Sequence, residues 1–156
     1  LSGSGLHDTL PANVITISQL NTAAKNIRNY YDSHSKTLPT SVTINAQTYT
    51  MSQMLYLLTT ATINMSNSNL YPIAAKTVNS ATSPSGTINS GNIVKSRYIS
   101  YAKSIRNYIN SYGRAPNYVA TTLGNMKLKY MVYMYSKIVN YYKSNNRLPN
   151  YVSITK

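Results

Sequence analysis

Apolar residues recur at helical spacing in four stretches of the chain. The spacing predicts helices near residues 17–33, 51–66, 96–112 and 127–145. The first apolar stripe consists of Leu20, Ala23, Ala24, Ile27, Tyr30 and Tyr31. Between the helices lie polar stretches with short β-branched segments such as 42–44, which favour strands of only two or three residues.

Three of the predicted helices carry the same phrase: an Ile, an Asn two positions later and then a Tyr. A proline follows the Ile by 11 or 12 residues, and a β-branched segment comes after the proline. The copies begin at Ile27, Ile105 and Ile138, and their prolines are Pro39, Pro116 and Pro149. Repetition of this kind indicates stacked units that share a core. It favours an extended surface for a repetitive ligand over a single catalytic pocket.

The two halves of the chain are also related, because a shift of 78 residues places 27–30 on 105–108. We therefore expect a flexible segment at 1–12, a first pair of repeats at 13–91 that includes a Ser-, Asn- and Pro-rich connector, and a second pair at 92–156. The predicted fold is all-α. It would consist of tandem helix–Pro turn–short extended repeats, with two helical hairpins packed together and minor β pieces.

The charge of the chain is strongly positive. Fifteen Lys and Arg residues face two acids, Asp8 and Asp32, which gives a formal net charge of +13. Such a field attracts polyanions, whether nucleic acid, anionic lipid or an acidic wall polymer. The basic residues are dispersed, which is not typical of a basic disordered tail. We expect no membrane insertion, because no apolar run reaches transmembrane length.

The sequence contains few of the residues that catalysis usually requires. The lack of cysteine excludes disulfides and thiolate catalysis, and the few His and acids are too sparse for a metal shell. A paired-carboxylate mechanism would need Asp8 and Asp32 to meet. A Ser-His-Asp site that uses Asp32 and His34 lacks an accompanying nucleophile elbow. We therefore expect no enzyme activity, no cofactor and no metal.

Binding chemistry is better supplied. Tyr occurs sixteen times while Phe and Trp are absent, and so many hydroxyl-bearing rings suggest surfaces that are partly wet. Amide and aromatic groups suit sugar rings, and arginine can hold a carboxylate with two hydrogen bonds. The candidate ligand-binding residues are Asn117, Tyr118, Asn150, Tyr151, Arg114, Arg147, Arg28 and Arg106. The alternative is that the turn tyrosines pack against the next helix and that Arg28 and Arg106 lie on a solvated face.

The turn phrases Gly113–Val119 and Asn146–Val152, with the helix at 101–109, resemble the pseudomurein-binding repeat. This repeat occurs in cell-surface adhesin-like proteins of methanogenic archaea and in endoisopeptidases that cut their wall. The resemblance covers nearly all of 13–156 and is strongest in the second half. The first half departs from it, with Thr40-Ser41 in place of Asn-Tyr.

The resemblance implies a non-catalytic cell-wall-binding module, located outside the cell, that attaches a surface protein or a wall-lytic enzyme to pseudomurein. That polymer carries a uronic acid and glutamate, so it is an anionic partner for a chain of charge +13. Two alternatives from other classes are a basic helical protein that binds nucleic acid and a hydrolase that uses Asp32 and His34. The dispersed charge and the absence of a known nucleic-acid motif count against the first of these.

Overall fold

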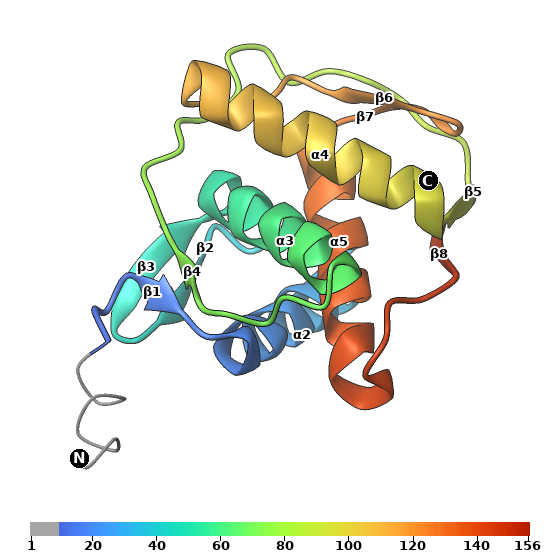
Figure 1. The fold of residues 1–156 in the computed structure, drawn as a ribbon. Coiled ribbons are helices and arrows are strands. Elements are labelled where there is room, and N and C mark those ends of the chain that lie inside the picture. The colour runs from blue at the N-terminus through green and yellow to red at the C-terminus, as the bar shows by residue number, and fades with distance from the viewer. Residues whose placement is uncertain (1–9) are drawn as a thin grey trace.

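The computed structural model describes residues 10–156 (Figure 1), so most of the segment predicted to be flexible lies outside the described residues. The helices are α2 (Ile17–Ser33), α3 (Met51–Ser66), α4 (Lys95–Tyr112) and α5 (Leu128–Asn145). The strands are β1 (Val14–Ile15), β2 (Ser41–Ile44), β3 (Gln47–Thr50), β4 (Ile73–Ala74), β5 (Gly91–Val94), β6 (Val119–Thr121), β7 (Gly124–Met126) and β8 (Tyr151–Ile154).

The prediction of an all-α fold is wrong. Within residues 10–156 the four helices are accompanied by eight strands, which form four two-stranded antiparallel sheets. The fold is therefore mixed α and β. The physical reason is that the segments between helices satisfy their backbone N–H and C=O groups in short ladders instead of leaving them to water.

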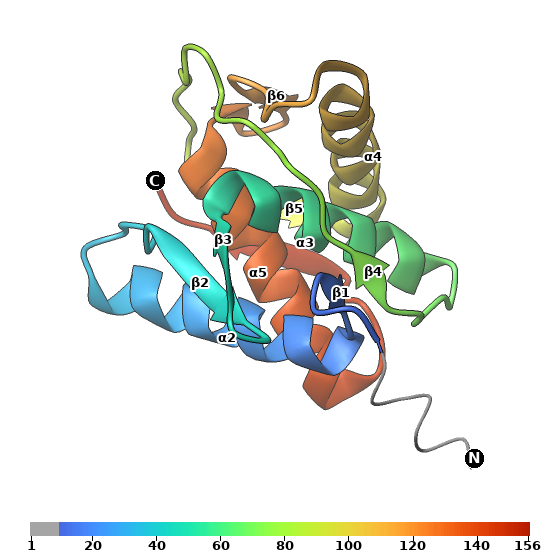
Figure 2. The same ribbon diagram turned by 90° about the vertical axis from the view of Figure 1, so that its left-hand side faces the viewer.

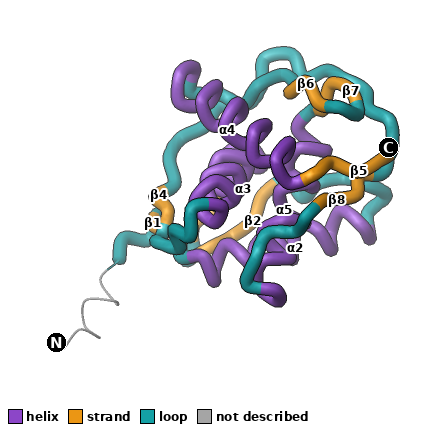
Figure 3. The backbone as a smooth tube through the Cα atoms, turned by 45° about the vertical axis from the view of Figure 1, so that its right-hand side comes forward, coloured by secondary structure: helices purple, strands orange, loops and turns teal. Residues whose placement is uncertain are grey.

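The two halves share one element order, strand–helix–strand–strand–helix–strand. In each half the outer strands pair with each other, β1 with β4 and β5 with β8. The inner strands form the hairpins β2–β3 and β6–β7. Figure 3 shows β5 and β8 side by side near the C-terminus. The internal repetition seen in the sequence is thus a repetition of topology.

The predicted pair of helical hairpins is also wrong. Each helix packs mainly against helices of the other half: α2 against α5, and α3 against both α4 and α5. In Figure 1, α3 and α5 occupy the middle of the molecule, with α4 above them and α2 below. Exchange of the two halves converts the α2–α5 contact into the α4–α3 contact and returns the α3–α5 contact to itself. The helices therefore pack like the two subunits of a symmetric dimer.

The hydrophobic core is a single cluster to which both halves contribute. Twelve of the sixteen residues of α3 are buried, including Met54, Leu55 and Leu58. The α5 side of the core is formed by residues such as Met131 and Tyr135. Because α3 is covered on nearly all sides, it serves as the platform against which the outer helices are positioned.

The connector between the halves is fixed along its length to the second half. The N–H of Asn79 donates to the Gly113 carbonyl at 2.9 Å, and the N–H of Asn89 donates to the Leu123 carbonyl at 2.8 Å. Ile88 and Val78 enter the core. The connector therefore lies against the turn after α4 and against the β6–β7 hairpin.

Candidate ligand-binding grooves

The repeated helix–Pro turn–strand unit forms a groove in three places. The α4 groove lies between α4 and β6, and its residues include Ser104, Tyr108, Pro116, Tyr118 and Val119. The α5 groove lies between α5 and β8 and is lined by Lys137, Tyr141, Arg147, Pro149, Asn150, Tyr151, Val152 and Ser153. Residues 33 positions apart occupy matching places in the two grooves, as Tyr118 and Tyr151 do.

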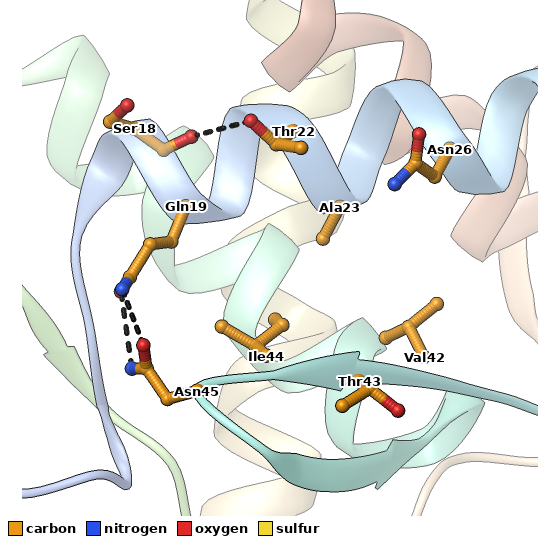
Figure 4. Close-up of a pocket in the computed structure, with 9 residues that line it drawn as sticks. All are labelled: Ser18, Gln19, Thr22, Ala23, Asn26, Val42, Thr43, Ile44 and Asn45. Atoms are coloured by element: carbon orange, nitrogen blue, oxygen red, sulfur yellow. Dashed lines mark hydrogen bonds between the residues drawn. The ribbon is translucent and has the colours of Figure 1, made fainter.

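The α2 groove is the equivalent site in the first half, between α2 and the β2–β3 hairpin (Figure 4). Its walls are formed by small and polar side chains, including Thr22, Ala23 and Thr43, and no aromatic or charged side chain of the described residues lines it. One end is closed by a hydrogen bond of 2.7 Å from the Gln19 amide to Asn45 Oδ1. The three grooves have similar cavity volumes, about 460, 390 and 380 Å³ for α2, α5 and α4, near the lower end for small-molecule sites.

The α5 groove combines an aromatic surface with two cations. Tyr151 is 55% exposed although it belongs to a paired strand. The guanidinium carbon of Arg147 lies 5.6 Å from the centroid of the Tyr141 ring, a cation–π distance. Lys137 Nζ donates to the Ser153 carbonyl at 2.7 Å. This groove can therefore offer a ring face, an amide and positive charge to one ligand.

Buried tyrosine hydroxyls hold the proline turn of the α5 groove. The buried hydroxyl of Tyr98 on α4 donates to the Pro149 carbonyl, and the hydroxyl of Tyr135 donates to the Tyr98 carbonyl at 2.6 Å. Burial raises the pKa of both tyrosines above the ordinary value, because the phenolate form would lose its hydration. The groove thus rests on neutral, hydrogen-bonded rings.

The pKa of Lys137 on α5 depends on charged residues of the neighbouring helix α2. Burial lowers the pKa of Lys137, the positive charge of Arg28 lowers it further, and the carboxylate of Asp32 opposes both effects. That carboxylate accepts a hydrogen bond of 2.7 Å from the Tyr133 hydroxyl. Burial, with this hydrogen bond, raises the pKa of Tyr133.

The α4 groove is less charged. Tyr118 is 46% exposed, and Ser104 occupies the position that corresponds to Lys137. Arg114 lies outside this groove, with its guanidinium carbon 5.4 Å from the centroid of the Tyr112 ring. Asn117 Oδ1 accepts a hydrogen bond of 2.8 Å from the N–H of Ser83. The carboxamide of Asn117 is thereby engaged in holding the connector.

The two helix arginines named by the sequence lie apart from the three grooves. Arg28 lies at a cleft between α2 and α5, and its Nε donates to Asn29 Oδ1 at 3.1 Å. Arg106, its counterpart on α4, is half-buried. The structure thus brings together Arg147, Asn150 and Tyr151, places Tyr118 in the matching groove, and leaves the remaining candidates elsewhere.

Several residues that line the α5 groove, Lys137 and Tyr141 among them, were not sequence candidates. The helix–turn register would have indicated them, since the repeat places position 141 four residues after 137 and on the same side of the helix. The α5 helix thus forms one wall of the groove and the proline turn with β8 forms the other.

The hydrolase arrangement is not assembled. Asp32 accepts from Tyr133, whereas the His34 ring stacks on Tyr30 at 3.7 Å and its Nδ1 lies 2.9 Å from Ser33 Oγ. Among residues 10–156 no group of three or more His, Cys, Asp or Glu side chains is placed to hold a metal ion. No helix in that range is both long and apolar enough to span a bilayer.

Comparison with known proteins identifies one segment. Residues 131–154 match the family model of the pseudomurein-binding repeat. Every residue that lines the α5 groove lies within this segment. The resemblance is therefore confirmed for the repeat that carries the most elaborate groove. No curated protein and no solved structure matches the chain.

The matched family is a repeat that binds pseudomurein, which is a cell-wall polymer. It indicates pseudomurein binding and association with the cell wall or cell surface.

Proposed function

We propose that this chain is a non-catalytic module that binds pseudomurein and attaches the protein carrying it, a surface protein or a wall-lytic enzyme, to the wall of a methanogenic archaeon. The observation that supports this most is the coincidence of the matched segment with the α5 groove. In this groove the exposed ring of Tyr151 would receive a sugar or peptide face, and Arg147 would hold a carboxylate of the polymer.

The α4 groove would act as a second contact. Tyr118 presents the same ring at the same position of the repeat, without the two cations. Each groove alone would bind weakly. Because both belong to one rigidly packed core, occupation of one raises the effective concentration of polymer at the other. A repetitive polymer can occupy both grooves at once, so its affinity gains most from this arrangement.

Retention on purified sacculi tests the proposal. The chain is incubated with pseudomurein sacculi, with bacterial murein sacculi and with immobilised DNA at about physiological ionic strength, where exposed charges are screened beyond about 8 Å. We expect retention on pseudomurein above that on the other two. Retention on DNA without retention on pseudomurein would instead support the nucleic-acid alternative that the +13 charge permits.

A second arm tests the absence of catalysis. Sacculi incubated with the chain should release no soluble fragments above the level of a buffer control. A steady release of fragments, lost on substitution Asp32→Asn, would contradict a purely binding role.

A further inference from the structure

A fourth concave site lies between α2 and α5 and is lined by cations from both helices. In Figure 2, α5 descends through the middle of the molecule and its C-terminal end lies beside α2 in the lower part; the two helices pack against each other. The α2–α5 cleft contains three cations, Lys25, Arg28 and Lys143, and its cavity volume is about 420 Å³. It shares edge residues Thr22 and Asn26 with the α2 groove.

Among residues 10–156, no acidic side chain lines the α2–α5 cleft. Asp32, the acid on the same helix, accepts a hydrogen bond from Tyr133. The three cations come from two packed helices and line the same cleft, and like charges repel one another. An anion bound between them would reduce this repulsion.

An unpartnered buried amide marks the floor of the cleft. Asn21 is 7% exposed, and its Oδ1 has no hydrogen-bond partner among the described residues. A buried polar atom without a partner costs about 1–3 kcal/mol. A half-turn of the carboxamide exchanges the oxygen for its two N–H donors. Because the Oδ1 position itself is covered, donation to an anion in the cleft also requires a change of the Asn21 side-chain rotamer toward the lining surface.

The repeat itself shows that this cleft is special to one side of the molecule. Lys25 corresponds to Lys103 on α4, and Asn21 corresponds to Ile99. On the packing partner, Lys143 of α5 corresponds to Ser66 of α3. The equivalent α3–α4 contact therefore lacks both the buried amide and the cation from the second helix.

We propose that the α2–α5 cleft is a binding site for carboxylate groups of an acidic polymer, separate from the tyrosine-bearing grooves. The guanidinium of Arg28 retains donors beside its bond to Asn29 for a two-pronged contact with a planar carboxylate, and Lys25 and Lys143 neutralise the charge. Carboxylates of this kind occur on uronate glycans and on glutamyl peptides. Nucleic acid fits less well, because in the described part of the chain no aromatic side chain lines the cleft to stack a base.

The test compares two charge-matched variants of the full chain. Lys25→Gln/Lys143→Gln removes two cations of the cleft. Arg97→Gln/Lys103→Gln removes two exposed cations of α4 that line neither the grooves nor the cleft. Affinity is measured by titration against polygalacturonate, against poly-L-glutamate and against single-stranded DNA, at one fixed ionic strength.

We expect the cleft variant to bind at least one of the two carboxylated polymers about three- to tenfold more weakly than the control variant. The polymer affected identifies glycan or peptide as the source of the carboxylate. Equal weakening of both variants would reduce the effect to net charge and overturn the proposal. So would a larger loss on DNA, or failure of the wild-type chain to bind either carboxylated polymer.

This outcome is separable from that of the sacculus experiment. If the chain does not bind pseudomurein but the cleft variant shows the selective loss on carboxylated polymers, the cleft proposal stands and the proposed function is contradicted. If the chain is retained on pseudomurein and both variants bind the soluble polymers equally, the proposed function stands and the cleft proposal is contradicted.

Discussion

Individual tyrosines divide into those that support the fold and those that face the solvent. Tyr98 and Tyr135 are fully buried, with their hydroxyls donating to backbone carbonyls. Tyr118 and Tyr151 are about half exposed at the grooves. The same residue type therefore has two roles in this chain, and the position in the repeat decides which one applies.

Substitution Tyr118→Ala/Tyr151→Ala should affect binding more than folding. Since both rings are half exposed, we expect the free energy of unfolding to fall by only about 1 kcal/mol. Retention on pseudomurein sacculi should weaken at least tenfold, as when aromatic anchors are removed from an interface. Thermal melting and sacculus binding, measured on the same preparation, check the two effects.

Tyr71→Ala is the matched control, because Tyr71 is 78% exposed and lines none of the grooves. It should leave both melting and retention near those of the wild-type chain. If the double variant lost stability and retention in equal measure, Tyr118 and Tyr151 would be packing residues only.

Buried tyrosines also predict a stability that depends on alkaline pH. Burial raises the pKa of Tyr31 to about 12 and raises those of Tyr98, Tyr133 and Tyr135 as well. The unfolded chain ionises near pH 10, so it releases protons that the folded chain retains. The contribution of these tyrosines to the free energy of unfolding is fully present below pH 10 and is lost as the pH rises through about 12.

The part of the tyrosinate absorbance that comes from these four rings should therefore appear together with the loss of the helical circular-dichroism signal. The lowered pKa of Lys137 acts in the opposite direction, but it is one group against four. Tyrosinate that formed fully near pH 10, without loss of helical signal, would contradict the burial of these rings.

Parts of the site could be foreseen from the residues themselves, and parts could not. The Asn-Tyr turn dipeptide left open whether Tyr118 and Tyr151 pack against a helix or face a ligand, and both rings are exposed. The same reasoning could not foresee that the Asn117 amide would hold the connector while Asn150 lines a groove. That difference depends on which segment passes over the turn, and it is a tertiary contact.

Among the elements, the helices were the most predictable. A capping box joins Thr50 and Gln53, with mutual hydrogen bonds of 2.9 and 3.2 Å, and a second box joins Thr16 with Gln19. Sequence signals of this kind are local, since both partners belong to one helical turn.

The hairpins were missed for a physical reason. The β2–β3 turn places Asn45 and Ala46 at φ 54° and 61°, the conformation that an Asn-Gly pair usually signals. Alanine at the second position conceals that signal. The strands have four residues or fewer, which is too short for an alternating pattern to emerge.

The connector offers a test of how firmly it is attached. Gly86 has φ +128°, and a Cβ there would lie 2.3 Å from the Asn125 carbonyl oxygen of β7. We expect Gly86→Ala to lower the free energy of unfolding by about 3 kcal/mol. Chemical denaturation of the purified variant gives this value.

Gly113→Ala serves as the comparison, because its φ is +70° and no atom lies within 4 Å of an added Cβ. Only the backbone strain remains there, about 1 kcal/mol. Equal and small losses for the two variants would show that the connector can move away from the hairpin at little cost.

The whole molecule depends on contacts between its halves. Helical periodicity within each half cannot reveal that α3 packs against α4 and α5, because the apolar stripe shows that a face is buried but not which partner covers it. The sequence therefore predicted two helical hairpins, whereas the structure has one shared core.

An isolated second half should consequently fail to fold. In a fragment of residues 92–156, α4 and α5 would lose the buried α3 on which both pack, and far-ultraviolet circular dichroism should show little helix. Mixing with a fragment of residues 13–91 should restore the helical signal. A well-folded 92–156 fragment would contradict the shared core.

Footprinting of the chain in complex with soluble pseudomurein fragments tests most directly the claim that the grooves bind the wall. Soluble pseudomurein fragments are added to the full chain, and hydroxyl-radical labelling of each tyrosine is measured by mass spectrometry. Binding should protect Tyr151 and Tyr118 and leave Tyr71 labelled as in the free chain. Fragments that bind while Tyr151 and Tyr118 remain fully labelled would contradict the account.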